Sequence, residues 1–429
     1  MLRLDWIRRW FGRGLWALTD RGLFSVSNFV LNILLARWLT PDGYGAFAIA
    51  FTMFLLLGAI HSGLLTEPML VFGPSKHRDR FREYLGVLLV WHVVFALGGS
   101  LVLIVAAAAT QGLGWSVTAG ALLALSIASP FILLQWLARM ACYVRLDPRP
   151  AAIAGITYLA MVIGGTVALH EAHRLSSASA LILMGGASLA SVAWLLFRLR
   201  PRWPGGSSET AFRKAVLADH WRYGRWASGT GILTWIPGQV YYLVLPLWGG
   251  LAATASLRAL MNLVMPIMHA YSALALLLTT VLARQRRGRF REVVAWSLLG
   301  FTAGAVVYWG VLGIGRDIFV DLLYDGRYGE VSSLLWLVGL IPVAGVGATV
   351  FAPALRALER PERVFVAYAV STIAALTVGL VLTVRGGPAG AALGILLSTG
   401  LVALVLAWQL RKVLRTGVDG RVESERGDV

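Results

Sequence analysis

Long apolar stretches, separated by short polar segments, recur along the whole chain. A helix needs about 20 mostly apolar residues to cross roughly 30 Å of hydrocarbon. Twelve stretches meet this need: residues 14–36, 44–66, 85–109, 117–138, 150–170, 178–197, 226–248, 255–283, 293–315, 332–355, 364–384 and 388–410. The pattern predicts an all-α, polytopic membrane protein with about 12 transmembrane helices.

The basic residues between these stretches predict the topology, because cytoplasmic loops carry the excess of Lys and Arg. With the N-terminus inside and the helices alternating, 31 of the 38 basic residues lie on inner segments. The outer loops hold five of them, Arg37, Arg174, Arg316, Arg327 and Arg385. A missed or spurious helix would invert the pattern after it. We therefore expect both termini to be cytoplasmic.

Composition supports this class and limits the partners. Hydrophobic residues make up 58% of the chain and charged residues 14%, whereas a soluble domain carries about 25% charge. The net charge of +17 follows the inner loops. We therefore expect the partner to be the lipid bilayer with its anionic headgroups and no nucleic acid. The single Cys142 excludes an internal disulfide and a cysteine-rich metal site.

A long hydrophilic segment near the middle predicts two lobes of six helices each, and Trp38 and Trp248 close the first helix of each half. Because each half has six helices, the first helix of both halves runs in the same direction. The two halves are therefore expected to be parallel repeats. We expect no cleavable signal peptide, and a helix over 209–221 in the linker. The predicted parts are an interfacial segment 1–13, an N-terminal lobe 14–198, a cytoplasmic linker 199–225, a C-terminal lobe 226–410 and a cytoplasmic tail 411–429, which is expected to be disordered from Thr416.

Two basic residues lie in neither set of loops, and each begins a polar stripe at helical spacing. The stripes are Arg21, Ser25, Asn28 and Asn32 in the first span, and Arg258, Asn262, Met265 and His269 in the eighth. One interpretation is a polar strip along a central cavity. The other is that Arg21 and Arg258 snorkel to the two interfaces and the amides pair with neighbouring helices.

Other polar residues in the spans carry weaker signals. Arg139, near the inner end of the fourth span, is expected to snorkel. Asp20 and Glu67 are acidic residues near the bilayer, suited either to binding a coupling ion or to being solvated carboxylates. The histidines within the spans, His61, His92 and His269, are too far apart in sequence to suggest a metal site. We expect no metal and no cofactor.

Sequence signatures of enzymes are absent: there is no phosphate-binding glycine loop, nucleophile elbow or His-Glu metal motif. The longest outer loop runs only from Arg316 to Glu330, too short for the external domain of a membrane glycosyltransferase or ligase. The sequence therefore favours transport over catalysis.

The turn after the first span has a recognisable sequence. Residues 35–48, LARWLTPDGYGAFA, resemble the LAR-x-L-(G/T)-P-x-x-(Y/F)-G-x-(Y/F)-A turn of polysaccharide transporters. These are the Wzx-like flippases of the multidrug/oligosaccharidyl-lipid/polysaccharide (MOP) exporter superfamily. Residues 20–28 and 67–69 also resemble this family, and the likeness covers about residues 10–85.

The resemblance implies a two-lobed bundle in the bacterial inner membrane that works by alternating access. Such proteins flip an undecaprenyl-pyrophosphate-linked oligosaccharide, or export a related glycan, for lipopolysaccharide or exopolysaccharide synthesis. A polysaccharide polymerase or other assembly proteins would be partners.

From their chemistry alone, Arg21 and Arg258 suit phosphate, since guanidinium groups bind it through forked hydrogen bonds. Amides suit sugar hydroxyls and aromatic rings suit sugar faces; the candidates are Asn28, Asn32, Asn262 and Gln239 for the former and Tyr241 and Tyr242 for the latter. Two other functions stay open. One is a cation-coupled multidrug exporter of the same superfamily. The other is a membrane scaffold of a polysaccharide assembly complex that does not transport.

Overall fold

The structure is a computed structural model that describes residues 2–203, 205, 209–283, 285 and 287–426. Within these residues every regular element is a helix, which confirms the predicted all-α class. The chain forms two compact units, Met1–Trp235 (unit 1) and Ile236–Val429 (unit 2). The division falls inside one helix, α8, ten residues after the point where the sequence placed the start of the second lobe.

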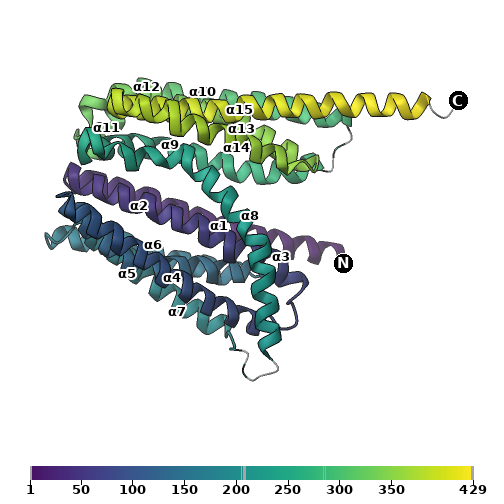
Figure 1. Ribbon diagram of the computed structural model, residues 1–429, viewed down its shortest axis with the longest axis horizontal. Coiled ribbons are helices and arrows are strands. Elements are labelled where there is room, and N and C mark those ends of the chain that lie inside the picture. The colour runs from purple at the N-terminus through teal and green to yellow at the C-terminus, as the bar shows by residue number, and fades with distance from the viewer. Residues whose placement is uncertain (1, 204, 206–208, 284, 286, 427–429) are drawn as a thin grey trace. The chain divides into compact units, whose positions relative to one another are not determined.

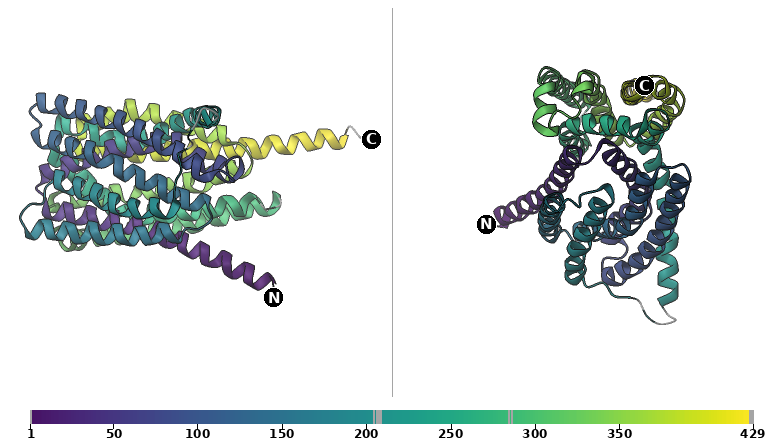
Figure 2. Two further views of the ribbon diagram at one scale, coloured as in Figure 1. Left: turned by 90° about the horizontal axis from the view of Figure 1, so that it is seen from below. Right: turned by 90° about the vertical axis from the view of Figure 1, so that its left-hand side faces the viewer.

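Unit 1 is a bundle of long helices that lie alongside one another (Figures 1 and 2). Its elements are α1 (Leu2–Trp38), α2 (Pro41–His61), the π-helix η1 (Ser62–Thr66), α3 (Glu67–Ser75), α4 (Phe81–Gly112), α5 (Ser116–Val144), α6 (Arg149–Glu171), α7 (Ser177–Leu199) and most of α8 (Thr210–Val244). The elements α2, η1 and α3 follow one another without a break.

The turn between α1 and α2 follows from its residue types. The Thr40 hydroxyl accepts a hydrogen bond from the Gly43 amide at 3.1 Å, and so caps one of the free amides at the start of α2. Pro41 occupies the first turn, where no backbone donor is needed. Asp42 places a negative charge at the positive end of the helix dipole. The turn that resembles polysaccharide transporters is therefore a strong helix start.

Unit 2 contains the remaining helices, some of them short or bent. They are α9 (Pro246–Ala283), α10 (Arg287–Ile314), α11 (Arg316–Tyr324), the 3-10 helix η3 (Gly329–Leu334), α12 (Leu335–Val338), α13 (Leu340–Ala357), α14 (Pro361–Ala374), the π-helix η4 (Ala375–Gly379) and α15 (Leu380–Arg426). Backbone kinks divide α9 at Gly250 and α15 at Gly387, both with positive φ, a conformation that glycine adopts at little cost.

The predicted spans all fall on helices. Among the described residues, nine helical runs are long and apolar enough to cross a membrane. They contain ten of the twelve predicted spans, because the run Pro361–Arg415 holds two spans on either side of the kink at Gly387. Span 14–36 lies on α1, and span 226–248 lies on α8 as far as Val244 and then enters α9; both spans carry more polar residues. The cytoplasmic position of the termini stays a prediction.

Three segments expected to be separate from the spans are instead parts of long helices. Residues 2–13 belong to α1, residues 210–221 begin α8, and residues 411–426 continue α15. The expected breaks at residues 14, 226 and 411 do not occur, because no proline lies near any of them. Residues 427–429 lie outside the described part.

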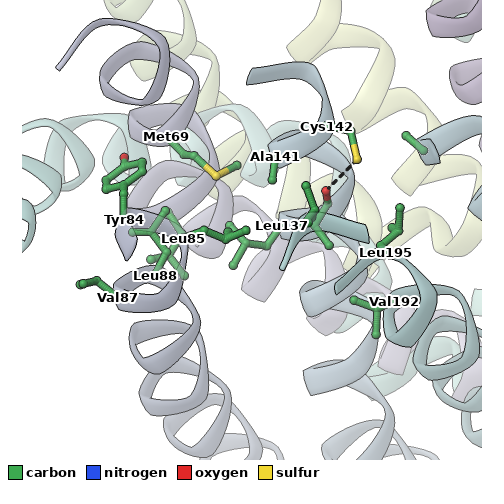
Figure 3. Close-up of a cluster of buried hydrophobic side chains, with 14 of the residues drawn as sticks. Met69, Tyr84, Leu85, Val87, Leu88, Leu137, Ala141, Cys142, Val192 and Leu195 are labelled. Atoms are coloured by element: carbon green, nitrogen blue, oxygen red, sulfur yellow. Dashed lines mark hydrogen bonds between the residues drawn. The ribbon is translucent and has the colours of Figure 1, made fainter. Parts of the chain in front are cut away.

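A separate apolar core lies in each unit. In unit 1, Met69, Tyr84, Leu85, Leu137 and Leu195 pack together from α3, α4, α5 and α7 (Figure 3). The helices α5 and α7 approach closely: a Cβ added to Gly185 would lie 2.8 Å from the Ala128 Cα atom. Small residues at such contacts are the usual basis of helix packing in membranes.

In unit 2 the core residues come from α9, α10, α13, α14 and α15, with Val350, Leu355 and Leu406 among the most buried. Here α13 and α15 approach closely at Gly347, where an added Cβ would lie 2.6 Å from Ala403 Cβ. Both bundles therefore rely on small residues to bring helix backbones together.

Candidate functional site

A buried ion pair joins α1 to α5 in unit 1. The Arg139 guanidinium donates to both carboxylate oxygens of Asp20, at 3.1 and 2.9 Å, and the Tyr143 hydroxyl donates to the same carboxylate at 2.7 Å. The guanidinium carbon also lies 4.5 Å from the centre of the Phe24 ring. The expectation that Arg139 snorkels is therefore wrong. Asp20, 119 residues away in sequence, compensates its charge inside the bundle.

The polar stripe of the first span has an exposed end and a buried end. Arg21 is exposed, Ser25 and Asn28 are half-buried, and Asn32 is buried. The Asn32 amide donates to the Asn28 carbonyl at 2.8 Å and its oxygen accepts a long hydrogen bond from Tyr44 at 3.4 Å. The structure therefore uses Asn32 to join α1 to α2, whereas Arg21 is accessible.

Arg258, which begins the second stripe, is almost completely buried at 1% exposure. Its guanidinium lies 5.6 Å from the centre of the Tyr242 ring and is hydrogen-bonded to the Tyr242 side chain. The snorkelling alternative therefore does not hold for Arg258 in this conformation. Asn262 is buried as well, whereas His269 at the other end of the stripe is exposed.

The other candidates of α8 are enclosed in unit 2 to different degrees. Tyr241 and Tyr242 are buried, and the Tyr241 hydroxyl lies 3.0 Å from that of Ser398 in α15. In this conformation neither ring is open to a sugar. Gln239 is half-buried, and its side-chain oxygen has no hydrogen-bond partner among the described residues. In unit 1, Glu67 is exposed at the start of α3.

Two histidines that are distant in sequence meet inside unit 1. The Nε2 atom of His61 in α2 lies 3.1 Å from Nδ1 of His92 in α4. Both rings are buried, and the Phe95 ring packs edge-on against His61. No sequence pattern indicated this pair, because 31 residues separate its members. The described residues contain no cluster of three or more potential metal ligands.

The beginning of α8, in the predicted linker, is fastened to unit 1 by polar contacts. His220 lies 2.6 Å from the Tyr84 hydroxyl through Nε2 and 2.9 Å from the Leu64 carbonyl through Nδ1. A carbonyl only accepts, so Nδ1 carries the proton and Nε2 accepts from Tyr84. Burial lowers the pKa of His220 to about 4. Asp219 forms ion pairs with Lys76 and Arg222.

A cationic cavity of about 710 Å³ lies at the end of unit 1 where α3, α4 and α5 meet the linker. Its lining includes five arginines, Arg78, Arg80, Arg82, Arg145 and Arg202, together with Asp79 and Glu83. Arg80 is paired with Glu83 and Glu209. Within the described part of the chain the other four arginines form no ion pair. Such a pocket attracts anions.

The fold is that of the MOP-superfamily transporters. The structure is similar to an inward-facing multidrug resistance transporter of the MATE family, with a TM-score of 0.76 and 13% identity over 91% of this chain and 94% of the other. It is also similar to the lipid II flippase MurJ in an inward closed conformation, with a TM-score of 0.71 and 13% identity over 94% and 87%. A MOP-superfamily transporter from Pyrococcus furiosus has a TM-score of 0.66 and 12% identity over 94% of both chains.

The family follows from the sequence. Residues 34–250, just over half of the chain, match the model of a family described as polysaccharide biosynthesis protein. The chain belongs to this family. No protein with curated annotation matches it. The family and the fold together confirm the resemblance to polysaccharide transporters of the MOP superfamily that the turn at residues 35–48 suggested.

Proposed function

We propose that this protein moves a lipid-linked oligosaccharide or polysaccharide precursor across the bacterial cytoplasmic membrane by alternating access. The observation that carries the proposal is the combination of a polysaccharide biosynthesis family with the fold of MOP-superfamily transporters in one chain. The MurJ structure, which has this fold, is named for flipping lipid II. A lipid-linked glycan is a substrate that is consistent both with the polysaccharide biosynthesis family and with the transporter fold.

The physical task of such a transporter is to shelter a polar headgroup while the lipid tail stays in the bilayer. Sugar hydroxyls and phosphates lose their hydration in hydrocarbon, at several kcal/mol for each group that finds no partner. Cationic and amide side chains along the path replace that hydration with hydrogen bonds. The protein therefore needs positive charge where the headgroup enters and where it crosses.

The cationic cavity of unit 1 suits the entry step. Four of its arginines are not neutralised by carboxylates of the described residues, and the cavity is large enough for a phosphate-bearing headgroup. It lies on segments that the charge pattern places on the cytoplasmic side, where lipid-linked precursors are made. We propose that the pyrophosphate of the precursor first binds here.

The crossing step would use the arginines of the two stripes. Arg21 is accessible in this conformation and suits a forked contact with phosphate. Arg258 is buried against Tyr242 and would have to be uncovered. Asn28, Asn262, Gln239 and the tyrosines of α8 would then face sugar groups only in a second conformation. Alternating access provides such a conformation.

A strain lacking the gene tests the proposal. Arg21→Ala and Arg258→Ala are each expected to reach the membrane at normal levels, to reduce surface polysaccharide at least about tenfold, and to cause lipid-linked precursor to accumulate. Arg174→Ala, at an exposed arginine of the predicted outer loops, is the matched control and should complement fully. Full complementation by the double variant R21A/R258A would contradict the cationic path and would favour a scaffold.

A multidrug exporter is the second candidate, since a multidrug resistance transporter shares this fold at a TM-score of 0.76. It predicts a different phenotype for the same strain. Loss of the gene would raise sensitivity to cationic drugs and leave surface polysaccharide unchanged. Measuring both properties in one deletion strain separates the two functions.

A further inference from the structure

The buried histidines of unit 1 have a defined arrangement of protons. His92 is hydrogen-bonded to the backbone carbonyl of Pro130 in α5, and a carbonyl only accepts, so the ring nitrogen facing it carries hydrogen. Since Nδ1 of His92 faces His61, that nitrogen is Nε2. Nδ1 of His92 then accepts from Nε2–H of His61. The remaining nitrogen, Nδ1 of His61, is buried and has no partner among the described residues.

A proton added to the pair would therefore go to Nδ1 of His61. The pair would become an imidazolium beside a neutral ring, inside a membrane-embedded bundle. Glu67, Arg139 and Arg225 lie on neighbouring elements, and among the described residues no carboxylate forms an ion pair with either ring. A buried charge without a counter-ion is strongly unfavourable. The conformation described here consequently binds this proton poorly.

The backbone next to His61 has two features that allow it to change conformation. The π-helix η1 begins at the next residue, and π-helical turns inside α-helices often mark functional sites because their hydrogen-bond register differs from that of the flanking helix. Gly63 in η1 packs directly on α8, where an added Cβ would lie 2.5 Å from the Ser228 amide nitrogen. The Ser228 hydroxyl also donates to the Ile60 carbonyl at 3.2 Å. A shift of α8 would therefore move the residues next to His61.

We propose that the His61–His92 pair is a proton-binding site that drives conformational change in unit 1. Proton binding is weak in the conformation described and stronger in one that opens Nδ1 of His61 to water or to a polar partner. By linkage, a proton that binds one conformation better shifts the population toward it. The inference rests on the proposed transport function and identifies the proton as the coupling ion.

Histidine-selective ¹⁵N NMR of the full-length protein in lipid nanodiscs tests proton binding directly. We expect both rings to be neutral at alkaline pH and to change together, with uptake of one shared proton, between about pH 8 and pH 4. His61→Gln should abolish the change at His92, since glutamine can donate and accept hydrogen bonds but does not titrate in this range. If neither ring titrates above about pH 4, the proposal is wrong.

Complementation of the deletion strain tests coupling. H61Q and H92Q are expected to reach the membrane normally and to lower surface polysaccharide about tenfold or more. His173→Asn is the matched control, because His173 has a positive φ that asparagine also adopts, and it should complement fully. If both His variants complement fully while R21A does not, coupling by the pair is refuted and the transport function survives. If loss of the gene itself leaves surface polysaccharide unchanged, the proposed transport function fails.

Discussion

Unit 1 and unit 2 each bury an arginine inside a helical bundle, but they surround it differently. In unit 1, Arg139 lies between the carboxylate of Asp20, the Tyr143 hydroxyl and the Phe24 ring. In unit 2, Arg258 contacts the Tyr242 ring and side chain. The carboxylate cancels the charge of Arg139 and ties two helices together. The contacts that Arg258 makes with Tyr242 are with an uncharged side chain, and this arrangement suits a group that later meets an anion.

The two π-helices show a parallel contrast. In each unit a glycine of the π-helix touches α8, but Gly63 of η1 meets the backbone at Ser228, whereas Gly379 of η4 meets the end of the Tyr241 side chain. A backbone contact cannot yield without moving the helix, while a side chain can turn. Movement of α8 is therefore transmitted more directly to the π-helix of unit 1, which is also the one that follows His61.

The largest expected effect comes from breaking the ion pair of unit 1. Asp20→Asn should lower the free energy of unfolding by roughly 3–5 kcal/mol, because it leaves the Arg139 charge buried without a counter-ion. Denaturant unfolding in detergent micelles would measure this. Asp42→Asn, at an exposed aspartate of the same unit, should change it by less than about 1 kcal/mol. The double variant D20N/R139Q should recover part of the loss; no recovery would mean that the two residues are not coupled.

A smaller effect is expected from pH, through His220. Its pKa is lowered to about 4 by burial, from about 6.5 in an unfolded chain. Between these values the unfolded chain binds a proton that the folded chain does not, so stability falls as the pH is lowered from 6.5 to 4. The contribution is at most about 3 kcal/mol.

His220→Gln should flatten this pH dependence, measured as the unfolding midpoint at a series of pH values, and H173N should preserve it. Some slope will remain, because burial also lowers the pKa of His77, with a further contribution from Lys76. An unchanged slope in H220Q would show that His220 is not held neutral between Tyr84 and Leu64.

The π-helix glycines give the smallest effect and compare the two units directly. Gly63→Ala and Gly379→Ala should each destabilise the protein by about 1–3 kcal/mol through overpacking. Removing the hydroxyl in Y241F should restore stability to the Gly379→Ala variant, because the nearest atom to the added Cβ is that hydroxyl, at 2.3 Å. Ser228→Ala should not restore Gly63→Ala, because the clash is with the backbone. Equal rescue of both would contradict the contrast between the two π-helices.

Much of the fold could be predicted from the sequence, since a chain that spans a bilayer must satisfy its backbone hydrogen bonds within each segment. Apolar length alone then determines where helices form, and all twelve predicted spans lie on helices. Helix ends were predicted less well. Residues 2–13, 210–221 and 411–426 extend neighbouring helices, because a polar segment without a proline or cap has no local reason to end a helix.

The sequence also located the exceptional arginines, Arg21 and Arg258, because basic residues within a span stand out against the charge pattern of the loops. It could not assign their surroundings. The alternatives of cavity and snorkelling depend on which helices are neighbours and on how each helix is rotated. The structure exposes Arg21 and buries Arg258.

The sequence alone therefore determined the local properties of the chain. These are its apolar lengths, the charges of its loops and the helix start at residues 40–43. The tertiary structure decided everything that joins distant segments: the pairing of Asp20 with Arg139, the contact of His61 with His92, and the cavity that brings Arg78, Arg145 and Arg202 together. These contacts arise from helix packing, whose energy is spread over many small van der Waals contacts. No short sequence pattern predicts which helices will pack against one another.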